Sequence, residues 1–209
     1  NYNMKVNEKV MYPLFSKVVS TADLHLNSSE WDKIKKIVES EKYKNVSQAS
    51  SMTENCHVLD NPDLKFLEKR LNVEVPASCN MFLKYKDKFK ITTSWFTNTK
   101  KGGYSDFHNH SNAMFSAVFY IQSNKETDKI AFSNFKTSTW LLEFTEQNIY
   151  NSQKLLIPTY AGLLLLFPAE VFHRIEPNVQ SEERISMAFN VVPTGSIGYN
   201  DSSLTLKCK

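Results

Sequence analysis

The pattern of hydrophobic and polar positions divides the chain into a helical part and a β-rich part. In residues 27–40, NSSEWDKIKKIVES, apolar side chains recur every three or four positions, which predicts an amphipathic helix capped by either serine of the opening NSSE. Residues 61–71, NPDLKFLEKRL, repeat leucine at the same spacing, with the opening asparagine as cap and proline in the first turn. Pro76 should end or kink this second helix, and a third helical piece is expected over 78–86.

From residue 90 onward the texture changes to short runs of apolar, β-branched and aromatic residues separated by turn-like clusters. The runs cover residues 90–97, 113–122, 129–135, 139–145, 154–159, 162–168, 171–176 and 184–192. About eight strands in about 100 residues, without a second block of helices, predict an antiparallel sandwich or barrel. We therefore expect a mainly β, α+β fold with N-terminal helices: a double-stranded β-helix, that is, a cupin-like jelly roll.

The expected domain organisation is one structural domain in three parts. Residues 1–89 would form a helical support region packed on the core, 90–195 the jelly-roll core, and 196–209 a C-terminal tail. The net charge of +3 is too small and too dispersed to predict a nucleic-acid partner. No apolar run reaches the roughly 20 residues of a membrane span, and the three cysteines lack a CxxC spacing. We expect a protein of a reducing cytoplasm without a membrane partner.

Two histidines lie at the entrance of one predicted strand, in the stretch FHNHSNAMFSAVFY. Residues two apart in a strand point to the same face, so His108 and His110 can present two imidazoles to one point while Asn109 faces away. An isolated H-x-H pair can equally be two polar edge residues. The letters HNH do not indicate an HNH nuclease, because that module needs a ββα metal finger and a basic surface that this chain lacks.

A third histidine follows a buried strand in GLLLLFPAEVFHRI. Pro168 breaks the strand, and His173 then opens the next one. In a jelly roll this arrangement brings a distal metal ligand back to the mouth where the first pair lies. Read alone, His173 is as readily a hydrogen-bonded histidine at the sheet rim. Three histidines with an open position would also suit a catalytic zinc ion.

The segment RISMAFNVV places a cation and a hydroxyl on one strand face. Arg184 and Ser186 share that face with Asn190, while the alternating apolar residues face the other side. An inward-facing arginine needs an anionic partner to offset its desolvation, and its planar fork matches a carboxylate. The alternative is a local salt bridge of Arg184 with Glu182 or Glu183.

Three blocks of the sequence together resemble a known family. SWF…FHNHSNAMFSAVFYIQ, LLLFPAEVFHRIEPN and ERISMAFNVVP are similar to the motifs HxHxN…SGVYY and RISxSFN of 2-oxoglutarate/Fe(II)-dependent oxygenases of marine bacteria and their phages. The resemblance covers residues 93–193. The iron ligands that it implies are His108, His110 and His173. The co-substrate residues that it implies are Arg184, Ser186, Tyr120 and Asn190.

The resemblance implies an enzyme that couples decarboxylation of 2-oxoglutarate to oxidation of a substrate, with Fe(II) and 2-oxoglutarate as cofactors. One position departs from the wider superfamily, which carries a carboxylate two residues after the first histidine, where this chain has His110. Three neutral imidazoles leave a ferrous site with two positive charges instead of one. Asp106 is an alternative carboxylate, since it is two residues from His108 on the same face.

The His110 departure keeps other functions open: a zinc hydrolase, a cupin-like dioxygenase, or a non-catalytic jelly-roll protein that binds metal. The substrate is a small molecule, a peptide or a nucleic acid, and the oligomeric state is not encoded in any motif. The Lys-, Asn- and Ile-leaning usage fits an AT-rich genome, such as that of a phage or a marine bacterium.

Overall fold

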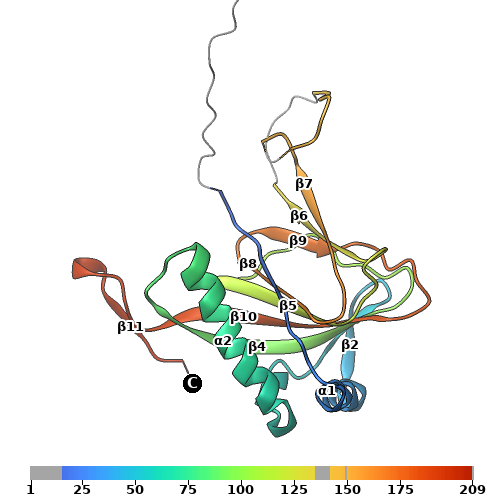
Figure 1. Cartoon of the computed structure of the whole chain (residues 1–209), viewed down its shortest axis with the longest axis horizontal. Helices are drawn as coiled ribbons and strands as arrows, with labels where there is room; N and C mark the ends of the chain where they lie inside the picture. Colours follow the sequence, from blue (N-terminus) through green and yellow to red (C-terminus); the bar gives the residue numbers. More distant parts are fainter. Residues whose placement is uncertain (1–15, 135–141, 149, 209) are drawn as a thin grey trace, which may run out of the picture.

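Two β-sheets and two α-helices make up the computed structural model over the residues it describes, 16–134, 142–148 and 150–208 (Figure 1). In spatial order the larger sheet contains β1 (Ser20–Asp23), β8 (Leu163–Pro168), β5 (Phe115–Gln122), β10 (Arg184–Ile197), β4 (Lys88–Thr99), β3 (Ser50–Thr53) and β2 (Tyr43–Ser47), with β11 (Leu204–Leu206) paired to β10. The smaller sheet contains β7 (Lys154–Pro158), β6 (Lys129–Ser133) and β9 (Phe172–Ile175). The expected mainly β fold, a double-stranded β-helix with N-terminal helices, is confirmed.

The first predicted helix is present as α1 (Ser28–Ser40), but its cap differs from the prediction. Asn27, not a serine, accepts a hydrogen bond from the Glu30 backbone N–H at 3.0 Å. The Glu30 carboxylate accepts one from the Asn27 N–H at 2.9 Å in return. This reciprocal capping box satisfies two N–H groups that a helix start leaves without partners.

The second helix runs further than its proline predicted. Asn61 caps a 3₁₀ turn, η2 (Pro62–Leu64), and α2 (Lys65–Phe82) continues directly from it through Pro76. Of the two effects expected of Pro76, an end or a kink, the end was wrong, and so was the separate third piece over 78–86, because α2 itself continues to Phe82. Tertiary packing outweighs the local cost of the proline, because one face of the helix is buried in the turns both before and after Pro76. The buried residues on that side are Leu71, Val75 and Cys79. Two further 3₁₀ turns are η1 (Val58–Asp60) and η3 (Asn200–Ser202).

Strand alternation gives the larger sheet two different faces. One face packs against the helices, with side chains such as Phe119 and Phe189 in the main core. The opposite face closes over the smaller sheet, where Tyr120, Leu165 and Phe167 form a second apolar cluster with β6. Within β10 the residues next to Arg184 and Ser186 turn to the helix side, so the predicted split of this strand is confirmed.

Most of the predicted strands are present, and several strands were missed. The predicted run 139–145 is an exception: residues 142–145 are not a strand, and 139–141 lie outside the described residues. Strands β1, β2, β3 and β11 were not predicted, because their short sequences lack apolar alternation. The N-terminal part therefore adds strands to the larger sheet as well as helices. Neither helix in the described ranges is long and apolar enough to cross a membrane.

Candidate functional site

The three predicted histidines come together between the two sheets. His108 and His173 form an antiparallel bridge, with backbone N–H to oxygen distances of 3.0 and 2.9 Å. The His110 N–H donates to the Ala169 carbonyl at 2.9 Å, which holds this segment extended. As the alternation predicts, Asn109 between them is exposed. The side-chain nitrogens of the three histidines that could ligate a metal all lie within 4.8 Å of one another.

Hydrogen bonds fix which ring nitrogen faces the centre of this cluster. The His108 Nδ1 lies 2.8 Å from the Asp106 carbonyl oxygen, and the His173 Nδ1 lies 3.1 Å from that of Val171. A carbonyl oxygen only accepts, so both Nδ1 atoms carry the hydrogen and both Nε2 lone pairs are left for a metal. The Nε2 atoms of His110 and His173 are 3.4 Å apart. Two imidazole nitrogens about 2.1 Å from one ion are separated by about 3.0–3.4 Å, so this spacing fits shared ligation.

Burial keeps two of the imidazoles neutral. Burial, with a smaller contribution from the neighbouring His108, lowers the pKa of His173 to about 3 and that of His110 to about 4. The Trp95 ring stacks on His110 at 5.8 Å between centroids, and the Phe167 ring meets His173 edge-on at 4.6 Å. Neutral imidazoles bind a metal without first losing a proton, so the site is prepared for an ion at neutral pH.

The same pKa values predict how the metal-free protein responds to acid. The folded-state pKa of His110 and His173 lies below the unfolded value of about 6.5, so the unfolded chain binds more protons between these values. Their contribution to stability is fully present above pH 6.5 and is lost as the pH falls toward 4 and 3. We expect the free energy of unfolding to drop by about 2 kcal/mol for each histidine, or about 4 kcal/mol in all, from pH 7 to pH 5, measured by urea denaturation. A flat profile over this range would contradict it.

Asp106 does not join the histidine cluster. Its side chain is exposed, and its contact with His108 is made through the backbone carbonyl oxygen. Within the described residues, the group that could hold a metal consists of the three histidines without a carboxylate. The geometry therefore gives no support to Asp106 as the third ligand.

A polar row lies further along the inner face of the larger sheet. Tyr120 on β5 and Thr97 on β4 flank Ser186 on β10 in register. The Ser186 and Thr97 hydroxyls are 2.7 Å apart. Ala188 pairs with Trp95 one row toward the histidines, and Arg184 lies one row further away. Arg184 and Ala188 are four residues apart on β10, which separates their Cα atoms by roughly 13 Å.

Arg184 has an acidic partner that the sequence did not predict. Its Nη1 donates to Asp128 Oδ1 at 3.3 Å, and its Nη2 donates to the Glu176 carbonyl at 2.7 Å. The side chains of Arg184 and Asp128 are only 2% and 4% exposed. The alternative of a local salt bridge with Glu182 or Glu183 is wrong. Burial lowers the pKa of Arg184 and Asp128 opposes that shift.

Two buried donors at this end of the site have no hydrogen-bond partner among the described residues: Tyr120 Oη and Arg184 Nε. A buried polar group left without a partner costs about 1–3 kcal/mol. Burial raises the pKa of the Tyr120 hydroxyl, which keeps it protonated and able to donate. An N–H and an O–H in this position suit a ligand carboxylate, so the residues present fit the distal end of 2-oxoglutarate.

The fourth predicted co-substrate residue, Asn190, lies elsewhere on the same sheet face. It is six residues from Arg184, roughly 20 Å along the strand, on the far side of the Trp95 row. Its amide accepts from Ser116 at 3.0 Å and donates to Thr93 at 3.1 Å. A β-bulge between β10 and β4 accompanies it. The structure therefore does not bring Asn190 together with Arg184, Ser186 and Tyr120.

Three residues near the site had no predicted role. Trp95 and Thr97 alternate along one predicted strand, so their shared face was a usable signal. The sequence carried no usable signal for Asp128, because an aspartate in NKETDK before a strand is typical of a turn.

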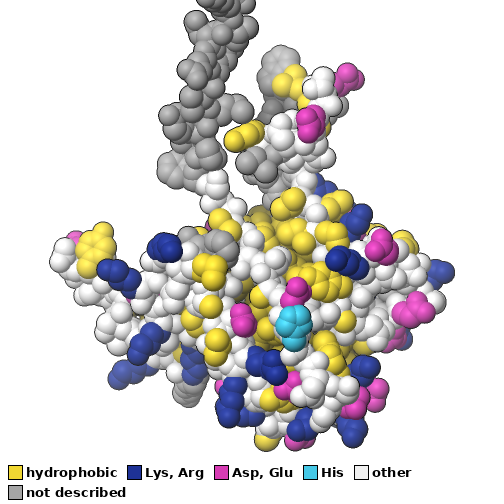
Figure 2. All heavy atoms as spheres, in the orientation of Figure 1, with side chains coloured by type: hydrophobic (Ala, Val, Ile, Leu, Met, Phe, Trp, Pro, Cys, Tyr) yellow, Lys and Arg dark blue, Asp and Glu magenta, His cyan; other side chains and the backbone are white. Residues whose placement is uncertain are grey.

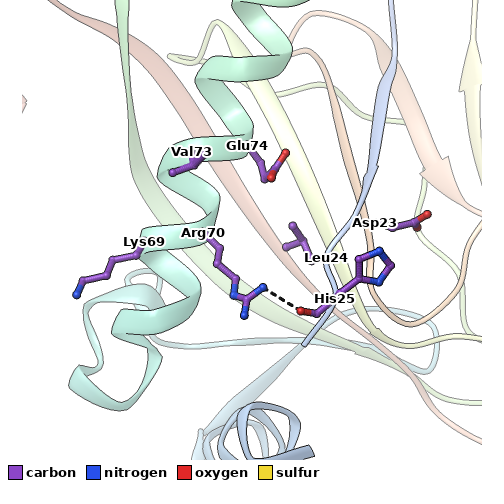
Figure 3. Close-up of a pocket in the computed structure, with 7 residues that line it drawn as sticks. All are labelled: Asp23, Leu24, His25, Lys69, Arg70, Val73 and Glu74. Carbon is purple, nitrogen blue, oxygen red and sulfur yellow. Dashed lines mark hydrogen bonds between the residues drawn. The ribbon is translucent and has the colours of Figure 1, made fainter. Parts of the chain in front are cut away.

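A surface pocket away from the histidines lies on the helix side of the molecule. It measures about 380 Å³ and lies between α2 and the segment after β1, with Lys69, Val73 and Glu74 on the helix side (Figure 3). Arg70 donates to the His25 carbonyl at 2.9 Å and forms an ion pair with Glu30, so its positive charge is already balanced within the protein. This region belongs to the helix side of the larger sheet, whereas the histidines lie on its inner side.

The visible surface agrees with the small net charge. Figure 2 shows Lys and Arg side chains interspersed with Asp and Glu, and hydrophobic side chains gathered below the β6–β7 hairpin. This face carries no extended area of one charge that would indicate a nucleic-acid interface.

Residues 93–190 match the model of a family described as "Putative 2OG-Fe(II) oxygenase". No curated protein matches the chain in sequence.

Solved structures of oxygenases share the fold. A 2OG-Fe(II) oxygenase family oxidoreductase from Burkholderia pseudomallei superposes with a TM-score of 0.61 at 10% identity, covering 83% of each chain. HygX from Streptomyces hygroscopicus with nickel and 2-oxoglutarate bound gives 0.62 at 10% identity, covering 84% of this chain and 83% of that one. A prolyl hydroxylase from Trichoplax adhaerens, in complex with a hypoxia inducible factor peptide fragment, gives 0.58 at 13% identity, covering 83% and 82%.

Proposed function

We propose that the chain is a non-haem Fe(II)- and 2-oxoglutarate-dependent oxygenase that couples decarboxylation of 2-oxoglutarate to oxidation of a substrate. The observation that carries the proposal is a cluster of three imidazoles between the two sheets, together with partnerless buried donors further along the inner face of the larger sheet. A zinc hydrolase would give the partnerless donors, Arg184 Nε and the Tyr120 hydroxyl, no ligand to bind. The match of residues 93–190 to the oxygenase family model supports the same function.

In this function His108, His110 and His173 hold the iron through Nε2. Arg184 Nε and the Tyr120 hydroxyl bind the distal carboxylate of the co-substrate. When bound, Fe(II) and 2-oxoglutarate would supply the means to activate dioxygen, one oxygen atom of which ends in succinate and the other in the oxidised substrate, with release of carbon dioxide. The protein's residues orient the co-substrate and exclude water.

Two further residues of the inner face have proposed tasks. Ser186 would add a hydroxyl to the co-substrate pocket, which its register beside Tyr120 supports. Trp95 would shield the His110 side of the metal from water, which its stacking on that ring supports. Asn190 lies beyond the Trp95 row, and we place it on the substrate side.

The substrate class is open to both small molecules and peptides. HygX has been solved with hygromycin B bound, and the prolyl hydroxylase with a peptide fragment. We propose a reducing cytoplasm as the location, supported by three free cysteines in the structure. The composition supports a source in a phage or a marine bacterium.

The test is an anaerobic titration of the metal-free protein with Fe(II) and then 2-oxoglutarate. We expect the weak visible charge-transfer band of the chelated keto acid, and consumption of 2-oxoglutarate once oxygen and substrate are supplied. Metal binding without a band would instead favour a zinc hydrolase or a cupin-like dioxygenase. Absence of metal binding would leave only the jelly-roll fold.

A further inference from the structure

The number of charges in the proposed site raises a question about Asp128. Three imidazole ligands leave both positive charges of Fe(II) uncompensated, whereas a triad with one carboxylate leaves one. Arg184 adds another positive charge. Three positive charges would then face the two negative charges of 2-oxoglutarate. Asp128 brings this total back to two, although it lies at the arginine and not at the iron.

Asp128 is held firmly in this position. Its Oδ1 accepts from Arg184, and its Oδ2 accepts from the Ser123 hydroxyl at 3.0 Å and from the Asn124 backbone N–H at 2.8 Å. The residue is 3% exposed and directly precedes β6. The carboxylate therefore bridges the turn between β5 and β6 and the buried arginine of β10.

Other acids near Arg184 direct their carboxylates elsewhere. Glu176 contacts Arg184 through its backbone carbonyl, while its carboxylate pairs with Lys154 and Arg174. The Glu183 carboxylate accepts from the Asn98 amide at 2.6 Å and lies 3.8 Å from Lys100. Among the described residues, Asp128 is thus the acid whose side chain contacts the guanidinium.

We propose that Asp128 is a positioning residue that sets the charge of the co-substrate pocket. It holds one edge of the guanidinium, so that Nε stays available to the distal carboxylate of 2-oxoglutarate. It also offsets the positive charge that His110 leaves on the iron site. Because its charge opposes an incoming carboxylate, Asp128 keeps dianions such as 2-oxoglutarate and succinate exchangeable. This inference rests on the proposed function.

The test compares the wild type with Asp128→Asn, which keeps the size and an acceptor for Arg184 but removes the negative charge. Affinities for 2-oxoglutarate and succinate are measured anaerobically with Fe(II), by calorimetry and by the charge-transfer band for 2-oxoglutarate. We expect both dianions to bind about tenfold tighter or more. The melting temperature of the ligand-free variant should fall, because Arg184 is left with an unpaired buried charge.

Two controls separate this role from a structural one. 2-Oxopentanoate has the same chelating group but no distal carboxylate, so its affinity should not change in Asp128→Asn. Glu183→Gln removes a neighbouring negative charge that does not contact Arg184, and it should leave all affinities unchanged. If Asp128 only held the turn between β5 and β6, Asp128→Asn would lower the stability of the protein and weaken the binding of both 2-oxoglutarate and 2-oxopentanoate.

The outcomes distinguish this inference from the proposed function. Wild-type binding of 2-oxoglutarate with an unchanged or weaker affinity in Asp128→Asn would overturn the inference alone. Failure of the wild type to bind 2-oxoglutarate with Fe(II) would overturn the proposed function and the inference with it. Tighter binding confined to the dianions supports both.

Discussion

Replacing His173 by alanine should lower the affinity for Fe(II) at least about a hundredfold and abolish the charge-transfer band with 2-oxoglutarate. One of three nitrogen ligands is lost, and four-ligand zinc sites gain about 10–16 kcal/mol in total, or about 2.5–4 kcal/mol per ligand. His173 is the most buried of the three, and its ring lies between Phe167 and the other two imidazoles. Solvent therefore has little access to replace the missing ligand. The measurement is an anaerobic Fe(II) titration followed by 2-oxoglutarate.

The matched control for this variant is His25→Ala. His25 is exposed beside α2, on the helix side of the larger sheet, away from the histidine cluster (Figure 3). Its removal should leave metal affinity and the band at wild-type values. Circular dichroism should show the fold intact in both variants. If His173→Ala folds and still binds Fe(II) with wild-type affinity, the three-histidine site is not the metal site.

Local patterns predicted the parts of the site that lie on regular strands. Alternation along β10 placed Arg184 and Ser186 on one face, and the buried run before Pro168 placed His173 at a sheet edge. The H-x-H spacing placed two imidazoles on one side, although that segment is held by single bridges and not by a full strand. These features depend on the two-residue period of an extended chain, which is visible in sequence.

Contacts between distant segments could not be predicted in the same way. Asp128 and Arg184 are 56 positions apart, and their pairing depends on how the smaller sheet closes over the larger one. Pro76 was misread because its local cost is visible in sequence, whereas the packing that outweighs it is not. The cap of α1 was misplaced by one residue, since Asn27 and the serines beside it are all good caps.

The inner face of the larger sheet runs from the histidine cluster to Arg184. Strands β4, β5 and β10 carry Trp95 near the histidines, and Thr97, Tyr120 and Ser186 one row further on. Rows on one sheet face keep fixed spacings because each residue advances the strand by about 3.3 Å. The spacing between Trp95, whose ring stacks on His110, and Arg184 is therefore set by strand register, whereas the histidines come from β9 and from the segment before β5.

Replacing Arg184 by glutamine should weaken 2-oxoglutarate binding by about 2–5 kcal/mol, or roughly 30- to 4,000-fold. The distal carboxylate would lose its cation, while the chelating end of the molecule would keep its contacts with iron. Affinity for Fe(II) and for 2-oxopentanoate should stay within a few-fold of wild type. Anaerobic calorimetry with both keto acids measures the difference. Equal losses for both would contradict a specific role at the distal carboxylate.

The single variant also leaves Asp128 buried without its partner, which should cost about 3–5 kcal/mol of stability. The double variant Arg184→Gln/Asp128→Asn removes both charges and should recover most of that stability, measured by urea denaturation. Its affinity for 2-oxoglutarate should remain low, because the distal carboxylate still lacks a cation. Recovery of affinity together with stability would show that Arg184→Gln had acted through misfolding and not through loss of a carboxylate contact.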